Sequence, residues 1–131
     1  MIIDSSAIVA ILRHEPDAQQ FAEALTSTAS GKISAATLLE VSIVTDRMND
    51  PVLRLRLDEM LRSAQIQVVD VTLEQVQAGR QANRDFGKRS GHAAGLNFGD
   101  CFAYALAKVT GEPLLYKGDD FVHTDLRSVL G

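Results

Sequence analysis

The sequence predicts an α/β fold in which a mostly parallel central sheet of four to five short strands is flanked by helices. Short apolar segments alternate with segments of helical periodicity along the chain, a pattern typical of strands joined by right-handed helical crossovers. The chain has 131 residues, and 46% of them are hydrophobic, which is enough for one sizeable core. We therefore expect one domain spanning residues 1–131.

Four segments are predicted strands, because each is short, apolar and bounded by polar or turn-forming residues. They cover residues 1–4, 32–35, 66–71 and 114–116. In parallel α/β folds, ligands bind beyond the carboxyl ends of the strands. The residues that follow each predicted strand are therefore the first candidates for a functional site.

Helices are predicted between these strands from apolar spacing and from residues typical of helix starts. Pro51 suits the first turn of a helix, and Thr72 suits an N-cap. A glycine-rich, partly basic loop is predicted over 87–99, and the last helix over 100–109. The other predicted helices begin near Ser5, after Asp17 and after Ala35.

Composition favours a cytoplasmic protein. The single cysteine, Cys101, excludes an intramolecular disulfide framework. The first residues do not form a signal peptide, and no segment approaches the roughly 20 apolar residues that a membrane span needs. The net charge of −4 argues weakly against a surface that coats nucleic acid, although basic residues can still gather locally.

Acidic residues stand near several predicted strand ends and helix starts. Asp4 follows the first strand, the Asp119-Asp120 pair follows the last strand, and Asp100 opens a helix. Glu40 lies among apolar residues on another helix. Each position has a simpler explanation, namely a helix cap, a helix-dipole contact, a solvated turn or a solvent-facing side chain.

Together these acids indicate a cation site, because independent caps have no reason to converge on one edge of a sheet. Carboxylates gathered closely repel one another unless their pKa values rise or a cation binds between them. Oxygen ligands without histidine or cysteine suit Mg²⁺ or Mn²⁺. Such a metal can activate water and stabilise charge on phosphate, which predicts phosphodiester hydrolysis.

Four segments, "MIIDSSAIVAIL", "ISAATLLEV", "LNFGDCFAYALA" and "PLLYKGDDF", resemble the four acidic motifs of PIN-domain ribonucleases. Their order and spacing are similar to those of the VapC toxins of bacterial toxin–antitoxin modules, and the resemblance covers nearly the whole chain. It implies a single PIN-like domain over residues 1–131. It also implies an endoribonuclease that depends on Mg²⁺ or Mn²⁺.

The resemblance also implies roles for particular residues. Asp4 and Asp100 would coordinate metal, and Glu40 would position metal or water. Ser6 matches a hydroxyl that supports the first aspartate. The fourth motif departs from the commoner family form, so its acid is ambiguous; we favour Asp119 and keep Asp120 as the alternative.

The implied partners are an RNA substrate, a cognate VapB-like antitoxin and a second copy of the chain in a homodimer. The sequence does not distinguish transfer RNA from messenger RNA. Arg84, Lys88 and Arg89 precede the last helix and are candidates for RNA phosphate contacts, the alternative being a solvated helix end.

Two other functions compete with this prediction. A receiver-like phospho-signalling domain also places acids at strand ends, but Asp4 is followed by serines rather than by a second acid. A PIN-like module that binds RNA without cutting it is the other alternative. Metal-dependent cleavage of RNA distinguishes the nuclease from both.

Overall fold

The computed structural model describes residues 1–27 and 30–131, and the strands within them form one parallel sheet. The order across the sheet is β3-β2-β1-β4, and each neighbouring pair is parallel. The predicted α/β class with a mostly parallel sheet is confirmed. The strands are β1 (Ile2–Ile3), β2 (Lys32–Ser34), β3 (Gln67–Val69) and β4 (Leu114–Leu115).

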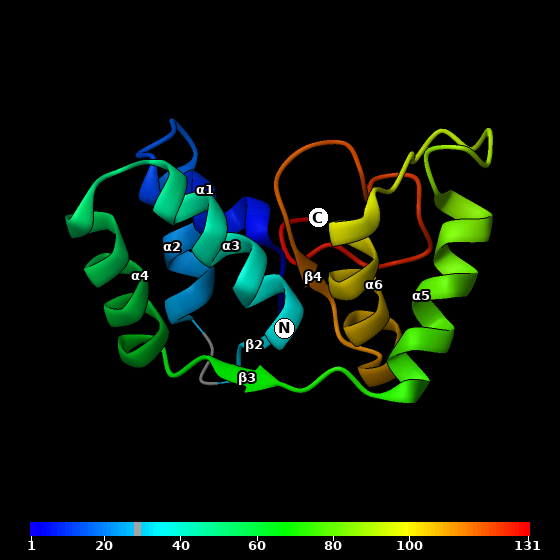
Figure 1. Ribbon diagram of the computed structural model, residues 1–131, viewed down its shortest axis with the longest axis horizontal. Coiled ribbons are helices and arrows are strands. Elements are labelled where there is room, and N and C mark those ends of the chain that lie inside the picture. The colour runs from blue at the N-terminus through cyan, green and yellow to red at the C-terminus, as the bar shows by residue number, and fades with distance from the viewer. Residues whose placement is uncertain (28–29) are drawn as a thin grey trace.

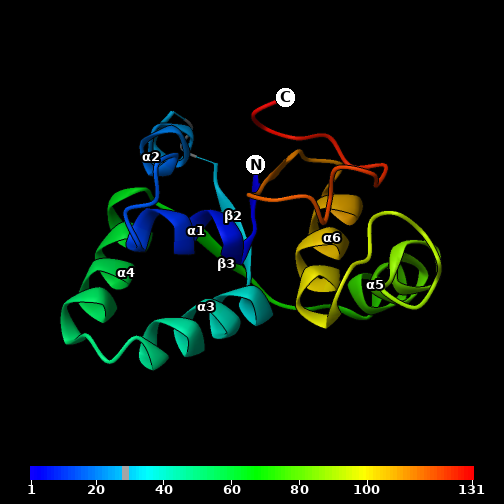
Figure 2. The ribbon, with the colours of Figure 1, turned by 90° about the horizontal axis from the view of Figure 1, so that it is seen from above.

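Helices cover both faces of this sheet. Figures 1 and 2 show α1 to α4 gathered on one side of the strands and α5 and α6 on the other. The helices are α1 (Ser5–Leu12), α2 (Ala18–Thr26), α3 (Ala35–Arg47), α4 (Pro51–Ser63), α5 (Leu73–Phe86) and α6 (Phe98–Thr110).

The central strand β1 divides the core in two, because successive side chains of a strand point to opposite faces. Ile3 packs in the cluster on the α1 to α4 side, and Ile2 packs in the cluster with α6. Both side chains are fully buried, and each contributes about 1.5–3 kcal/mol to stability. Packing on both faces holds β1 in place, and Asp4 is the residue that directly follows this strand.

The carboxyl ends of β1 and β4 lie side by side. The backbone N–H of Asp4 donates to the carbonyl of Leu115 at 2.9 Å, which continues the ladder just past both strands. The segments after the first and last strands, about 110 residues apart in sequence, therefore leave the sheet at the same edge.

Several helix starts match the predictions. Asp4 is the N-cap of α1, Thr72 caps α5 through the N–H of Gln75, and Pro51 is the first residue of α4. The predicted start of the last helix was wrong by two residues, because α6 begins at Phe98. Asn97 supplies the cap, which shortens the predicted loop at its C-terminal end.

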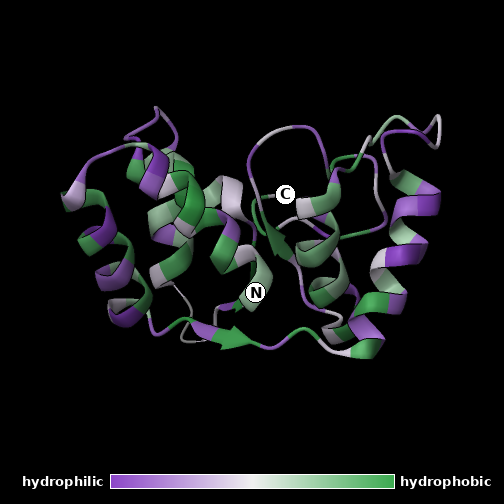
Figure 3. Ribbon diagram, in the orientation of Figure 1, coloured by the Kyte–Doolittle hydropathy of each residue, from purple (hydrophilic) through white to green (hydrophobic). Residues whose placement is uncertain are grey.

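Figure 3 shows the hydropathy of these elements. Hydrophilic residues are frequent on α4 and α5, the two outermost helices, whereas α6 is largely hydrophobic. The burial of Ala103, Tyr104, Leu106 and Ala107 explains this difference, since α6 packs between α5 and the sheet. In the described part of the chain, no helix is long and apolar enough to cross a membrane.

Candidate active site

Asp4 is a buried carboxylate with one oxygen bonded and one free. Its Oδ2 accepts hydrogen bonds from the Ser6 backbone N–H at 3.1 Å and from the Ser6 hydroxyl at 2.6 Å. Its Oδ1 is buried and has no hydrogen-bond partner among the described residues. Burial raises the pKa of Asp4 to about 6, with the negative charge of Glu40 adding to the shift. Capping α1 therefore uses only half of this carboxylate.

Asp100 stands in the first turn of α6 and forms a capping box with Asn97. The Asp100 side chain accepts from the Asn97 N–H at 3.0 Å, and the Asp100 N–H donates to the Asn97 side chain at 2.9 Å. Burial raises the pKa of Asp100 to about 7. The hydrogen bond from Asn97 opposes this rise, whereas the charges of Asp4 and Asp120 increase it.

The interactions of the fourth acid favour Asp120, although we preferred Asp119 from the sequence. Both side chains are exposed, but it is Asp120 whose charge raises the pKa of Asp100. Asp119 instead contributes its backbone carbonyl to a turn, accepting from the N–H of Val122 at 3.4 Å. The interaction with Asp100 is therefore our ground for preferring Asp120 as the candidate.

Ser6 connects Asp4 with the loop that carries this fourth acid. While its hydroxyl donates to Asp4, its oxygen accepts from the backbone N–H of Lys117 at 2.9 Å. The Lys117 ammonium in turn donates to Glu15 at 2.7 Å and to Asp17 at 3.0 Å. Lys117, at the start of the loop, is thus held by both its backbone N–H and its ammonium group. Through Ser6, this end of the loop is connected to Asp4.

Glu40 reaches the same edge from α3 and packs against Gly99. A Cβ atom placed on Gly99 would collide with the Glu40 carboxylate, lying 2.9 Å from its Cδ and 3.1 Å from its Oε1. No side chain larger than hydrogen fits at position 99 while Glu40 keeps this place. Gly99 thus allows the first turn of α6 to sit beside the Glu40 carboxylate.

The four acids interact in pairs. The charge of Glu40 raises the pKa of Asp4, and the charges of Asp4 and Asp120 raise the pKa of Asp100. Among residues 1–27 and 30–131, no group of three or more His, Cys, Asp and Glu side chains is arranged to hold a metal ion as it stands. Binding one ion through several of these acids therefore requires side-chain rotation, for which the exposed Asp120 has room.

The predicted basic residues surround a hollow next to this edge. Its volume is about 620 Å³, and it reaches from the end of α5 to the Asn97 cap of α6. Arg84, Lys88 and Arg89 all line it and are exposed. In the described part of the chain, none of the three takes part in an ion pair. Arg84 donates a hydrogen bond to Gln81 at 3.1 Å, so the charge of each of these residues remains available to an anion.

The profile of the PIN domain family matches residues 1–126. The chain belongs to the PIN domain family. Two curated relatives are both named as VapC ribonucleases. The VapC ribonuclease Mb0625 of Mycobacterium bovis is 51% identical over 130 residues, covering 99% of this chain and 98% of that protein. Ribonuclease VapC42 of Mycobacterium tuberculosis is 46% identical over 127 residues, covering 97% of each.

A solved structure supports the same fold. A chain of a toxin–antitoxin complex from Klebsiella pneumoniae superposes with a TM-score of 0.70 at 16% identity, covering 95% of this chain and 92% of that one. At that identity the likeness concerns the PIN fold alone. The resemblance noted in the four motifs is confirmed, and the receiver-like alternative is not supported.

Sequence reasoning missed several residues that shape this PIN site. Asn97 was detectable, because an Asn three residues before an Asp is a capping-box spacing. Gly99 and Lys117 were not detectable, since each contacts a residue far away in sequence, Glu40 and Glu15 respectively. Phe98, exposed at the start of α6, was also overlooked.

Proposed function

We propose that this protein is a metal-dependent endoribonuclease, the toxin of a type II toxin–antitoxin pair. The observation that carries the proposal is the buried carboxylate of Asp4, with an unpartnered oxygen, beside Asp100 at the carboxyl edge of a parallel sheet. Ligands bind at this edge in such folds. The names of the VapC ribonucleases, which match over nearly their full length, support the same reaction.

The residues present suit a hard divalent cation, Mg²⁺ or Mn²⁺. The Oδ1 atom of Asp4 is a buried oxygen without a partner, and carboxylate oxygens are the ligands that these ions prefer. Asp4 and Asp100 would bind the ion, with Glu40 and Asp120 contributing directly or through water. When bound, the ion supplies charge stabilisation at phosphate and lowers the pKa of coordinated water.

The chain itself provides position and charge. Ser6 and Asn97 hold Asp4 and Asp100 by hydrogen bonds, so each acid presents a fixed oxygen to the edge. Arg84, Lys88 and Arg89 would bind RNA phosphates without taking part in the displacement, since phosphate contacts position the substrate. Burial and the neighbouring negative charges raise the pKa values of the two aspartates, and a bound cation would offset both effects.

We infer two protein partners on different grounds. An antitoxin is supported by the names of the VapC relatives and by the toxin–antitoxin complex whose chain shares the fold. A homodimer is inferred from the resemblance to VapC toxins alone. Light scattering of the purified chain tests it. Because the substrate is RNA, we place the activity in the cytoplasm.

Cleavage of single-stranded and looped RNA tests the proposal, with Mg²⁺, with Mn²⁺ and with EDTA. We expect cleavage only with metal. We also expect that expression of the protein arrests bacterial growth and that Asp4→Ala relieves the arrest while remaining folded. A folded protein that binds RNA but never cuts it would favour the inactive PIN-like alternative.

A further inference from the structure

Phe98 is a large apolar side chain left in solvent. It is the first residue of α6, and 81% of its surface is exposed. Its ring meets the ring of Phe102 one turn later, with centroids 4.9 Å apart and planes at 85°. An edge-to-face contact of this kind holds the ring in place and leaves most of it accessible. Packing within the chain therefore does not account for a Phe at this position.

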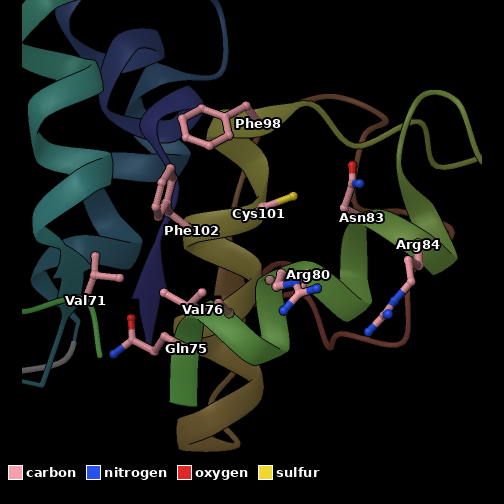
Figure 4. A pocket seen from close by; sticks show the side chains of 11 residues that line it. Val71, Gln75, Val76, Arg80, Asn83, Arg84, Phe98, Cys101 and Phe102 are labelled. Atoms are coloured by element: carbon pink, nitrogen blue, oxygen red, sulfur yellow. The ribbon is translucent and has the colours of Figure 1, made fainter. Parts of the chain in front are cut away.

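The ring of Phe98 stands between two hollows. One is the basic hollow lined by Arg84, Lys88 and Arg89. The other is an apolar groove of about 650 Å³, lined by Phe98 and Phe102 from α6 and by Arg80 and Arg84 from α5 (Figure 4). Phe98 thus lines both hollows, and basic side chains line each of them, with Arg84 common to the two.

Phe98 is also close to the acidic edge in the chain and in the fold. It follows the Asn97 cap and precedes Gly99 and Asp100. Gly99 lies against the Glu40 carboxylate, and Asp100 interacts with the charges of Asp4 and Asp120. A nucleotide chain lying in the basic hollow would therefore pass this ring on its way to the carboxylates. Phe98 and Asp100 share the first turn of α6, Lys88 and Arg89 lie in the loop before it, and Arg84 lies near the end of α5.

This combination matches single-stranded nucleic acid better than an apolar protein surface. Proteins bind unpaired strands by stacking bases on aromatic rings while basic side chains follow the phosphates. An apolar partner covering Phe98 would also have to cover neighbouring arginines and lysines that have no ion-pair partner, and burying unpaired charges is costly. Charge complementarity therefore favours RNA as the occupant.

We propose that Phe98 is a stacking platform for an unpaired nucleobase, and that it sets which phosphate of the RNA reaches Asp4 and Asp100. The inference rests on the proposed ribonuclease function, which it deepens. It predicts a preference for unpaired RNA, because a base inside a duplex cannot offer its face to the ring.

Binding of an end-labelled single-stranded RNA in EDTA, followed by fluorescence anisotropy, tests the proposal without cleavage. Phe98→Leu keeps an apolar side chain but removes the ring, and should weaken binding about tenfold, whereas Phe98→Tyr should bind nearly as the wild type does. Leu55→Ala is the matched control, because Leu55 is also an exposed apolar residue, at 69%, but lies on α4, on the other side of the sheet from α6 (Figure 1). It should leave binding unchanged.

A second measurement reports the contact itself. The chain has no tryptophan, so Phe98→Trp introduces a single indole whose emission should fall when the same RNA is added. Leu55→Trp should show no such change. Because both positions are exposed, all these variants should melt within a few degrees of the wild type, which excludes misfolding as the cause.

The outcomes separate this inference from the proposed function. If the wild type binds and cuts RNA while Phe98→Leu binds equally well, stacking is wrong and the nuclease assignment stands. If Phe98→Leu binds RNA normally but changes the oligomeric state in light scattering, Phe98 belongs to a protein interface and the inference is overturned. If the wild type neither binds nor cuts RNA, both fall together.

Discussion

The carboxylate of Glu40 occupies the space beside Gly99 that a Cβ atom would need. This relationship joins two helices, because Glu40 lies on α3 and Gly99 lies in the first turn of α6. It brings Glu40 to the edge where Asp100 begins to interact with Asp4 and Asp120. The absence of a side chain at position 99 is thus part of how the acidic site is assembled.

Gly99→Ala should therefore lower RNA cleavage about a hundredfold while leaving the protein folded, because displacing a positioned group by about 1 Å costs that much. Alanine favours the helix itself, so thermal stability should fall little. Gly79→Ala on α5 is a matched control, since its Cβ would meet its nearest neighbour at an ordinary 3.5 Å. Full activity of Gly99→Ala would show that the position of Glu40 is unimportant.

The fold was largely predictable because its signals are local. Apolar runs bounded by turn residues located the four strands seen among the described residues, and Asp4, Pro51 and Thr72 marked helix starts correctly. The start of α6 was misplaced because the N-cap is Asn97, whose side chain accepts from the Asp100 N–H. The spacing of Asn97 and Asp100 is that of a capping box, a local signal that the prediction did not use.

The site was less predictable because its contacts are long-range. Sequence placed acids at strand ends, but the interaction that favours Asp120 over Asp119 depends on the shape of a loop. The hydrogen bond from Lys117 to Ser6 joins residues 111 positions apart. No local pattern records such a pairing, nor the fit of Glu40 against Gly99.

The two acids of the last motif should differ in their effect on cleavage. Asp120→Asn removes a charge that acts on Asp100 and should reduce the rate at least tenfold, whereas Asp119→Asn should retain most activity. The pair is its own control, because the substitutions are chemically identical and both sites are exposed. Rates measured at saturating Mg²⁺ decide between them, and a slower rate for Asp119→Asn than for Asp120→Asn would restore the preference drawn from the sequence.

The basic cluster should affect binding rather than the chemical step. Replacing Arg84, Lys88 and Arg89 with Ala should weaken RNA binding and lower the slope of affinity against salt by about 0.7 for each RNA phosphate that the protein no longer neutralises. Saturating RNA should then restore much of the rate. Replacing Arg54 and Arg62 on α4 is the control. An unchanged salt slope in the triple variant would mean that these cations form only a solvated surface.

The stability of the metal-free protein should depend on pH through Asp4 and Asp100. Their folded pKa values, about 6 and about 7, lie above the ordinary 3.8. Stability from these groups is therefore fully present below about pH 4 and is lost as pH rises through 6 to 7. In EDTA, the melting temperature should decrease as the pH is raised from about 5 to about 8. Added Mg²⁺ should raise the melting temperature more at the higher pH.

Asp100→Asn isolates this effect, because Asn can still accept the hydrogen bond from the Asn97 N–H. Near pH 8 in EDTA the variant should melt at or above the wild-type temperature, since one repelling charge is gone, and it should gain less from Mg²⁺. A variant that melts lower in EDTA yet keeps the full Mg²⁺ response and RNA cleavage would show that Asp100 serves only as part of a helix cap.

The most direct test of a metal-dependent nuclease site follows Mn²⁺ binding and RNA cleavage in the same samples, for the wild type and for Asp4→Asn. We predict that cleavage rises with occupancy of a Mn²⁺ site in the wild type, and that Asp4→Asn neither binds Mn²⁺ nor cuts RNA while remaining folded. Cleavage of RNA by the wild type in EDTA, or undiminished cleavage by a folded Asp4→Asn protein, would contradict it.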